Sequence, residues 1–289
     1  MFSSDRKGPL CMLAASICWS FGGLCIKFIP WGAMSIVGLR AALAAVVFAI
    51  WRRSVSVSLT KNSLLSALCL SLTTILFVFA NKLTTAAAAI LLQFSAPIFI
   101  ILMQLLFYRI KPKRAEIIAA AVTIAGMLLF FADRIEVGNM LGNLLAIASG
   151  VSFAGVFVCN KRPDVDTEKS LFLGFLINAV IGLPFVFFEA TADPVAWVAV
   201  LFLGIVQVGL AYVFFSVGIK KTTALLACLI TAMEPVLNPV WVAIATGEKP
   251  GPFALAGGAV IVVTVVIYNI WLEKHPAESA AEHRAPRKT

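Results

Sequence analysis

Histidine and acidic residues are scarce in this sequence, and their scarcity excludes most kinds of enzyme. There are two histidines, His275 and His283, both close to the C-terminus, and only 14 Asp and Glu among 289 residues. The sequence also lacks a Cys-x-x-Cys pair, a glycine-rich phosphate-binding loop and a Gly-x-Ser-x-Gly nucleophile elbow. We therefore predict no enzyme, no metal site, no cofactor and no ATP hydrolysis by this chain.

Cysteines that could form a disulfide framework are absent as well. All six cysteines lie within apolar stretches, so no set of bridges in the loops is expected. Cys11, Cys18 and Cys25 recur every seven residues, which places them on one face of a helix. We interpret them as small residues that allow close helix packing, with a thiol or metal role as the alternative.

Apolar residues, by contrast, dominate the chain. They make up 61% of the residues, and the mean hydropathy is +0.99. Average proteins contain about 45–50% apolar residues, so this composition predicts an all-α integral membrane protein. A hydrocarbon core of ~30 Å requires about 20 apolar residues in each helix. The segments that meet this requirement, ten in number, are 9–28, 32–51, 62–81, 84–107, 115–132, 138–158, 170–188, 195–218, 223–246 and 253–272.

Basic residues are divided unequally between the two sides that these ten transmembrane helices define. Both termini lie on one side, and that side receives 18 Lys and Arg against 3 on the other. By the positive-inside rule, both termini are cytoplasmic. The net charge of +9 therefore reflects membrane topology rather than a nucleic-acid partner. We predict a multi-pass protein of the cell inner membrane.

The two halves of the chain resemble each other. Lys-Leu-Thr-Thr-Ala at 82–86 and Lys-Lys-Thr-Thr-Ala at 220–224 are each followed by a proline and then by Lys-Pro, at an offset of 138 residues. Because each half holds five spans, an odd number, the second half enters the membrane from the opposite face. We predict two inverted five-helix repeats, 8–134 and 135–274, and a disordered cytoplasmic tail, 275–289. Inverted repeats are the architecture of alternating-access transporters.

The most unusual span is the ninth. It carries a carboxylate, Glu234, near its middle, directly before Pro235, and Asn238-Pro239 follows one turn later. A central acidic residue costs roughly 2.5–3.5 kcal/mol on insertion scales, and each proline removes a backbone donor. Thr231, Glu234 and Asn238 share one helical face. We expect that face to point into a cavity inside the protein.

Together these features resemble the EamA group of the drug/metabolite transporter superfamily, over about residues 8–272. The resemblance rests on a mid-helix proline in the fourth span of each repeat, in Gln93-Phe-Ser-Ala-Pro97 and Met233-Glu-Pro-Val236, and on Gly247-Glu-Lys-Pro250 before the last span. Trp19, Gly22 and Lys27 resemble the family's first-span pattern, and Arg40 falls where the second span of the family often carries arginine. One position departs from the family, because the first repeat has Arg109 near the end of its fourth span where the family usually has a glutamate, as at Glu248.

The resemblance implies a ten-helix secondary transporter that works by alternating access. Its substrate would be a small metabolite, such as an amino acid, a purine or a drug-like compound, and it would cross the bacterial inner membrane, with export favoured over uptake. Without ATP hydrolysis, uphill transport must draw on a gradient of an ion or of another substrate.

Glu234 and Arg40 are the leading candidates for substrate binding and coupling. Glu234 would bind a cationic group of the substrate, or take up and release a proton as the cavity changes sides; the alternative is a structural carboxyl group. Arg40 lies roughly 13 Å into its span at 1.5 Å per residue. We expect it to face Glu234 across the cavity, as a pair or through a substrate that carries both charges. Its alternative partners are carbonyl groups freed by Pro97 or Pro235.

Further residues are expected to complete the site. Gln93 and Thr231 occupy equivalent positions in the two repeats, Trp19 and Tyr212 offer stacking surfaces, and Thr74 and Asn238 offer polar contacts. The predicted helix breaks are Pro97, Pro235 and Pro239. The remaining expected lining residues are Ser20, Thr73, Phe77, Asn178, Gln207 and Tyr268. Lys27 and Lys161 either take part in function or extend towards the membrane surface.

Three functions remain open at this stage. The first is a transporter that is proton-coupled through Glu234. The second is a pH-independent facilitator in which Glu234 is structural, and the third is a membrane scaffold or sensor subunit that transports nothing. A transporter requires a small-molecule substrate, all three require the lipid bilayer, and the chain is expected to be a monomer or a homodimer.

Overall fold

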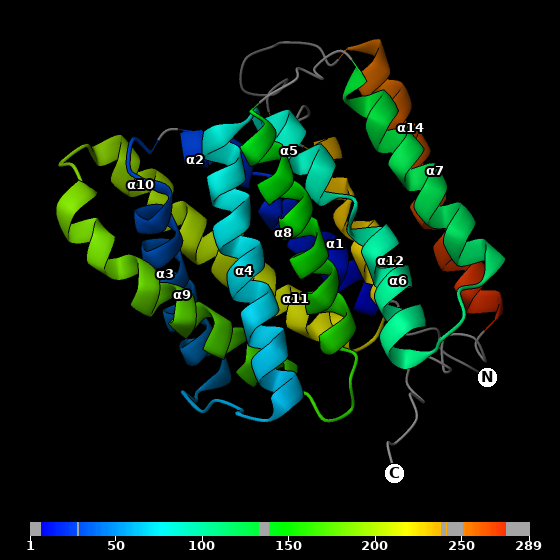
Figure 1. Ribbon diagram of the computed structural model, residues 1–289, viewed down its shortest axis with the longest axis horizontal. Helices are drawn as coiled ribbons and strands as arrows, with labels where there is room; N and C mark the ends of the chain where they lie inside the picture. The colour runs from blue at the N-terminus through cyan, green and yellow to red at the C-terminus, as the bar shows by residue number, and fades with distance from the viewer. Residues whose placement is uncertain (1–6, 28, 133–138, 238–240, 242–250, 276–289) are drawn as a thin grey trace.

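The computed structural model describes residues 7–27, 29–132, 139–237, 241 and 251–275, and these residues form helices joined by short loops (Figure 1). The helices before residue 132 are α1 (Lys7–Trp19), α2 (Gly22–Lys27), α3 (Ala33–Arg52), α4 (Lys61–Leu83), α5 (Ala86–Gln93), α6 (Ala96–Tyr108) and α7 (Arg114–Phe130). Those after residue 139 are α8 (Met140–Cys159), α9 (Thr167–Glu189), α10 (Pro194–Phe202), η2 (Leu203–Leu210), α11 (Ala211–Ile219), α12 (Ala224–Thr231) and α14 (Pro252–Lys274).

Within the described residues, 7 helical stretches are long and apolar enough to cross a membrane. They correspond to the second, third, fourth, sixth, seventh, eighth and tenth predicted spans. The fifth predicted span forms α7, which has 17 residues. The first is divided into α1 and α2, and the ninth is described as an apolar helical stretch only as far as Leu237.

Two of the predicted spans are interrupted close to a proline. A turn at Phe94 and Ser95 separates α5 from α6, and Pro97 then occupies the first turn of α6. Proline is favoured there because the first helical N–H groups have no partner inside the helix. In the second half, α12 ends at Thr231 and helical structure resumes after Ala232, just before Pro235. Both breaks therefore precede the proline by two or three residues.

Two further irregularities were not predicted from the sequence. A turn at Ser20 and Phe21 separates α1 from α2 within the first span, whose one proline, Pro9, lies at the start of α1 and not at this break. In the eighth span, α10 and α11 are joined through η2, a π-helical segment. π-Helical segments change the direction in which side chains point and are frequent at functional sites. Both irregularities lie beside the cavity described below.

The helices pack in pairs that combine the two halves. α3 packs along α9, α4 packs against α8, and α1 packs against α11. α7 and α14 lie side by side at the right of Figure 1, where they form the edge of the bundle. α4 also contacts α9, so that α3, α4, α8 and α9 form one continuous layer. The largest cluster of buried apolar side chains draws most of its residues from α1, α8, α9, α11 and α12.

Hydrogen bonds and ion pairs connect the helix ends at the two ends of the bundle. The first set connects α8, α9, α11 and α12. Lys161, just after α8, donates hydrogen bonds from Nζ to the carbonyl oxygens of Ile219 (3.0 Å) and Thr222 (2.6 Å). Lys220 pairs with Glu168 of α9 at 2.6 Å. The end of α8, the start of α9, the end of α11 and the start of α12 therefore lie at one end of the bundle.

The second set of these contacts lies at the opposite end of the bundle. Lys82 of α4 donates from Nζ to the Ile29 carbonyl (2.9 Å), and the Glu189 carboxylate of α9 accepts from the backbone N–H of Gly32 (2.8 Å). Thr84 donates to Asn143 of α8 at 2.8 Å. These contacts join the loop before α3 and the start of α8 to the ends of α4 and α9.

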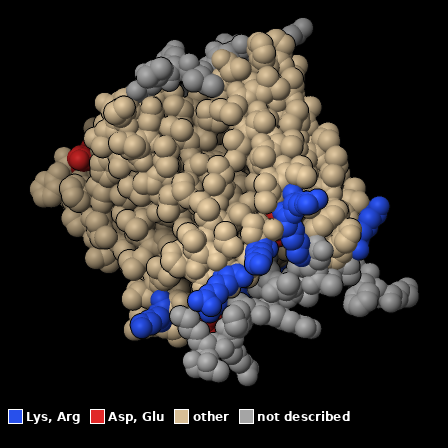
Figure 2. Space-filling view, turned by 45° about the vertical axis from the view of Figure 1, so that its right-hand side comes forward, with Lys and Arg blue, Asp and Glu red and all other residues tan. Residues whose placement is uncertain are grey.

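Basic side chains concentrate at the end that holds Lys161. Among the described basic side chains, the opposite end carries Lys82. Figure 2 shows Lys and Arg as a band along the lower part of the face in view, while the surface above it is almost free of charge. The described basic residues at the Lys161 end are Lys7, Arg52, Arg53, Lys61, Arg109, Lys111, Lys113, Arg114, Lys161, Arg162, Lys169, Lys220, Lys221 and Lys274.

Two glycines allow α3 and α9 to pack at very short range. A Cβ atom on Gly38 would lie 2.2 Å from the carbonyl carbon of Gly182, and a Cβ atom on Gly182 would lie 2.5 Å from the Cα of Gly38. Small residues at helix crossings permit this approach in membrane proteins.

Gly38→Ala is expected to destabilise the protein by about 1–3 kcal/mol, the usual cost of overpacking. The added methyl group meets backbone atoms, which cannot rotate aside as a side chain would. The measurement is the thermal unfolding midpoint of the purified protein in detergent. Gly258→Ala is the matched control, because its Cβ would first meet a side-chain atom, Cγ1 of Val236, at 3.2 Å. Equal midpoints for the two variants would contradict the close contact between α3 and α9.

Candidate functional site

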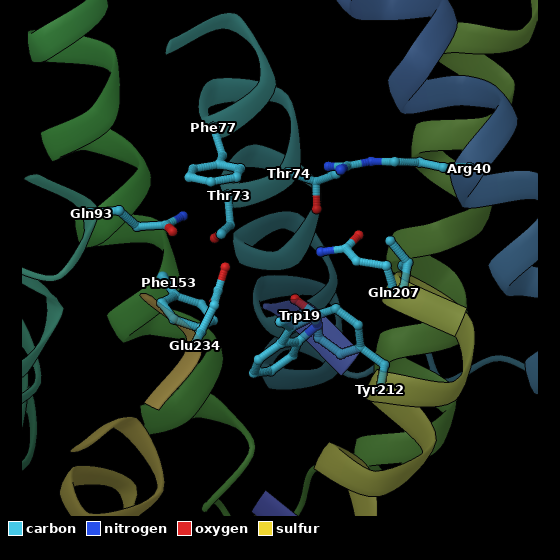
Figure 3. Close-up of a pocket in the computed structure, with 11 residues that line it drawn as sticks. Trp19, Arg40, Thr73, Thr74, Phe77, Gln93, Phe153, Gln207, Tyr212 and Glu234 are labelled. Atoms are coloured by element: carbon cyan, nitrogen blue, oxygen red, sulfur yellow. The ribbon is translucent and has the colours of Figure 1, made fainter. Parts of the chain in front are cut away.

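A cavity in the interior brings together polar and aromatic side chains from both halves of the chain (Figure 3). The space inside it that water-sized molecules can occupy is about 60 Å³. The lining residues are Trp19 of α1, Arg40 of α3, Thr73, Thr74 and Phe77 of α4, Gln93 of α5, Phe153 of α8, Gln207 and Val208 of η2, Tyr212 of α11, and Glu234 just beyond α12.

Arg40 supplies a positive charge to this cavity. Its guanidinium group extends from α3 towards Thr74 in Figure 3, and the residue is only 4% exposed. Its Nε has no hydrogen-bond partner, and Arg40 makes no hydrogen bond or ion pair with any residue that the structure describes. Burying an unpaired charge is costly, so the guanidinium group is a strong candidate for contact with an anionic ligand.

Glu234 supplies a negative charge from another wall of the cavity. The break at Ala232 positions it, and Ser16 of α1 donates a hydrogen bond to the carbonyl of Ile230 (3.0 Å) beside that break. The carboxylate points into the centre of the cavity in Figure 3. Within the described part of the chain, it too makes no hydrogen bond or ion pair.

The expected direct ion pair between Arg40 and Glu234 is therefore not present in this conformation. Both side chains enter the same cavity, but their charged atoms are not within the 4.0 Å of an ion pair. Nor does Arg40 bond to a backbone carbonyl among the described residues, which was the alternative expectation. The remaining expectation, a substrate that carries both charges, stays a prediction.

Aromatic rings form one side of the cavity. Trp19 packs against Tyr212, with ring centroids 5.1 Å apart at 66°, and against Phe153 at 6.1 Å. In Figure 3 these three rings lie together below the charged groups. Edge-to-face contacts of this kind fix the orientation of each ring. The wall is therefore a rigid apolar surface on which the uncharged part of a ligand can pack.

Two glutamines complete the polar lining. Gln93 donates from Nε2 to the Ser149 hydroxyl (2.7 Å), which in turn donates to the Thr73 carbonyl (3.1 Å). Gln207 differs, because its buried Oε1 has no hydrogen-bond partner. Its Nε2 lies 2.6 Å from where a Cβ on Gly22 would stand. The helix break before Gly22 and the absence of a side chain there make room for this amide.

Thr73 and Thr74 present acceptor atoms to the cavity. Each hydroxyl donates its proton to the carbonyl oxygen one turn earlier, at Cys69 (2.7 Å) and Leu70 (2.9 Å). A hydroxyl group that donates in this way still has lone pairs with which to accept a hydrogen bond. These two residues therefore favour a donor group, such as an ammonium or an amide N–H, on a ligand.

Most of the expected site residues lie in this one cavity. They are Glu234, Arg40, Gln93, Trp19, Tyr212 and Thr74, together with Thr73, Phe77 and Gln207 from the wider set. Thr231 is not among the lining residues; it is fully buried, and its hydroxyl donates to the Cys228 carbonyl at 2.6 Å. Asn238 and Pro239 lie outside the described residues. Pro97 and Pro235 are both buried beside the helix breaks already described.

The other residues expected in the lining have structural partners elsewhere. Ser20 accepts a hydrogen bond from the Trp241 indole at 2.8 Å, Asn178 accepts one from Ser71, and Tyr268 stacks on Trp271. Lys161 holds the end of α11, as described above, which gives it a structural role. The side chain of Lys27 is outside the described part of the structure.

Two lining residues, Phe153 and Val208, were not expected from the sequence. Both sit in uniformly apolar segments, where nothing separates a cavity-lining side chain from one that packs in the core or faces lipid. Phe153 has one local signal, since it lies one turn from Ser149 on the face of α8 that turns towards Gln93.

Known proteins resemble this chain along most of its length. The EamA-like transporter family matches residues 6–132 and again 140–270. The transporter YwfM of Bacillus subtilis is 24% identical over 231 residues, which cover 75% of this chain and 76% of that protein. The aromatic amino acid exporter YddG of Ancylobacter novellus is 27% identical over 196 residues, 63% of this chain and 68% of the exporter.

The fold itself is similar to that of a solved crystal structure. The two agree with a TM-score of 0.78 at 21% sequence identity, over 94% of this chain and 99% of the other. At this identity the similarity concerns the fold alone. Together with the apolar helices, the relatives indicate a multi-pass membrane protein that transports a small molecule and is not an enzyme. The chain belongs to the EamA-like transporter family.

Proposed function

We propose that this protein is a secondary transporter whose substrate is a small zwitterionic metabolite bound in the central cavity. The anionic group of the substrate contacts Arg40, its cationic group contacts Glu234, and its apolar part packs on Trp19, Tyr212 and Phe153. The observation that carries the proposal is the pair of opposite charges in one cavity, neither of which has a partner among the described residues.

An unpaired charge inside the protein raises its free energy. An ionised group away from water is stable only when it is paired or hydrogen-bonded. A ligand that brings both an anion and a cation compensates both residues at once and leaves no new charge behind. An amino acid has this chemistry, and one relative bears the name aromatic amino acid exporter. The aromatic wall favours an amino acid with a large apolar side chain.

Two inverted five-helix repeats, 8–134 and 135–274, account for the way the helices pair. At the 138-residue offset, α3 corresponds to α9 and α7 corresponds to α14, and each of these helices packs against its own counterpart. α4 corresponds to η2 and α11, and α8 corresponds to α1. The α4–α8 and α11–α1 contacts are therefore equivalent under the same exchange. A two-fold relation between the halves explains all four pairings.

The size of the cavity supports alternating access. A space of about 60 Å³ holds a few water molecules, whereas sites for small molecules usually measure about 300–1,000 Å³. Substrate therefore enters only when the two halves rock apart on one side. The helix breaks at Ser20, Phe94 and Ala232 provide the places where such a movement is absorbed, because a broken helix bends without losing its remaining hydrogen bonds.

Proton coupling through Glu234 would supply the driving force. When the cavity opens, a proton and the cationic group of the substrate compete for the same carboxylate, so that loading of one releases the other. The basic end of the bundle, which includes the start of α1 and the end of α14, faces the cytoplasm by the positive-inside rule. This orientation places both termini on the cytoplasmic side of the inner membrane.

A pH-independent facilitator is the second candidate within transport. It is favoured if Glu234 serves only to bind the substrate. A scaffold or sensor subunit without transport would have its polar side chains covered by neighbouring helices. Arg40 and Glu234 instead enter a cavity, which does not support that function. An imposed proton gradient that drives accumulation distinguishes the coupled transporter from the facilitator.

The test is a tolerance screen in cells that express wild type at a known membrane level. The panel contains amino acids and their toxic analogues, together with purines, cationic amines and monocarboxylic acids as classes that carry one charge or none. We expect altered tolerance to zwitterionic compounds, with increased resistance if the protein exports. Altered tolerance confined to purines, amines or acids would contradict the proposed substrate class.

A further inference from the structure

An apolar groove on the outer surface of the bundle lies between α3 and α9, away from the central cavity. It has a volume of about 580 Å³ and runs along the helix pair seen at the left of Figure 1. Phe187, Val180 and Val55 on its rim are strongly exposed. The residues that line it are Ala42, Ala45, Val46, Ala49, Val55, Phe172, Leu176, Ala179, Val180, Leu183, Pro184 and Phe187.

The groove is long enough to hold a single hydrocarbon chain. Phe172 and Phe187 are the ends of its α9 side, and the rise from one to the other is roughly 22 Å at 1.5 Å per residue. One leaflet of a bilayer provides about 15 Å of hydrocarbon, half of the ~30 Å core. The alanines of α3 and α9 form its floor, because their short side chains leave the space that a chain of methylene groups would fill.

Two arginines stand at one end of the groove. Arg52 is the last residue of α3, and its guanidinium carbon lies 5.4 Å above the ring of Phe172. Its Nη2 donates to the backbone carbonyl (3.1 Å) and hydroxyl (3.2 Å) of Ser56, whereas its Nη1 is buried without a hydrogen-bond partner. Arg53 follows directly and is exposed.

No described carboxylate neutralises these arginines. The acidic groups at the start of α9, the helix that carries Phe172, already have partners: Asp166 pairs with Lys169 at 3.1 Å, and Glu168 pairs with Lys220 at 2.6 Å. Neither Arg52 nor Arg53 forms an ion pair within the described residues. The end of the groove thus combines two uncompensated positive charges, one unused N–H donor group and the hydroxyls of Ser54 and Ser56.

We infer that this groove binds one molecule of an anionic phospholipid. An acyl chain lies between α3 and α9, and the phosphate group contacts Arg52 and Arg53. Guanidinium groups match phosphate oxygens with two parallel hydrogen bonds, and basic residues at the membrane surface select anionic headgroups. The continuity of an apolar groove with an uncompensated pair of arginines is what distinguishes this surface from the ordinary lipid-facing surface around it.

A second copy of the chain fits this surface less well. A two-fold dimer in a membrane with both copies in the same orientation brings the same patch of each copy together. Arg52 and Arg53 of the two copies would then lie at the same end of one interface, where like charges repel. The charges therefore favour a lipid over a self-contact.

Native mass spectrometry of the purified full-length protein tests the inference. The protein is incubated with equal concentrations of phosphatidylglycerol and phosphatidylcholine, which differ in headgroup charge. We expect wild type to retain one phosphatidylglycerol in preference to phosphatidylcholine by at least 5-fold. Arg52→Gln/Arg53→Gln should reduce that ratio to about one, because both lipids still share the groove but the phosphate contacts are gone.

Two further variants distinguish specific lipid binding in the groove from non-specific electrostatic attraction to the basic end of the bundle. Lys111→Gln/Lys274→Gln removes the same charge from the same end of the bundle and should leave the ratio unchanged. Ala42→Leu/Ala49→Leu fills the groove and should abolish the retained lipid with both arginines intact. Preserved unfolding midpoints identify variants that still fold.

Three results would overturn the inference. The first is a ratio that survives the loss of both arginines. The second is an equal loss in the Lys111→Gln/Lys274→Gln variant, which would indicate charge alone. The third is a dimer mass that the groove-filling variant disrupts, which would assign the surface to a second copy. None of these results depends on whether the protein transports a zwitterion.

Discussion

Arg40→Met is expected to reduce transport strongly at low substrate concentration and, at the same time, to leave the protein as stable as wild type or more stable. The guanidinium group is buried and makes no hydrogen bond with the described residues. Replacing a buried charge by an apolar side chain of similar volume is often neutral or stabilising, by about 1–4 kcal/mol. Loss of the contact to an anionic substrate group costs about 1.5–3 kcal/mol, or a roughly 10- to 100-fold weaker affinity.

The measurement combines the thermal unfolding midpoint with uptake of labelled substrate into proteoliposomes. Lys161→Met is the matched control, since it also replaces a basic side chain by methionine but breaks hydrogen bonds to Ile219 and Thr222. We expect that control to lower the midpoint. If Arg40→Met lowers the midpoint as much as Lys161→Met does, then Arg40 is structural and the proposed site loses its anion-binding group.

Glu234→Gln is expected to remove proton-driven accumulation while the protein still folds. Glutamine has nearly the same shape as glutamate, and no hydrogen bond of Glu234 to a described residue would be broken. The helix break beside it is held by Ser16 and Pro235, which the substitution leaves in place. A neutral amide can neither carry a proton nor neutralise an ammonium group, so we expect initial rates to fall at least 10-fold and the remaining rate to lose its pH dependence.

Proteoliposomes with an imposed pH difference provide the measurement. Glu189→Gln is the control, because Glu189 is a carboxylate at the end of the bundle that accepts hydrogen bonds from Gly32 and Ser35. It should change stability without changing the response to the pH difference. A Glu234→Gln protein that accumulates substrate as wild type does would contradict proton coupling and support the facilitator.

The coarse fold and much of the candidate site could be predicted from the sequence for one physical reason. In hydrocarbon, a charged or amide side chain must face a cavity or a partner, so Arg40, Glu234 and Gln93 could only point inward. Trp19 and Tyr212 could be predicted as lining residues because they lie on spans that also carry polar groups. The same reasoning identified the basic end of the bundle, because positive charges mark a side of the membrane rather than a contact in the fold.

The local geometry could not be predicted, because it depends on contacts between distant segments. No proline lies next to the break at Ser20, so the sequence does not indicate it. The π-helical segment around Gln207 lies in an apolar stretch that is equally typical of a regular α-helix. Thr231 was placed by helical spacing on the face of Glu234, but the break at Ala232 interrupts that spacing and its hydroxyl bonds to Cys228 instead. Arg40 and Glu234 also form no ion pair, because the distance between their charged atoms depends on how the helices pack, which could not be predicted from the sequence.

The most direct test of the account compares three ligands of the purified wild-type protein by isothermal titration calorimetry. They are the amino acid that the tolerance screen identifies, the amine that lacks its carboxylate, and the acid that lacks its ammonium group. The account predicts that the amino acid binds at least 10-fold more tightly than either fragment, and that Arg40→Met and Glu234→Gln each remove that advantage. Equal affinities for all three ligands, or an advantage that survives both substitutions, would contradict a site built from these two charges.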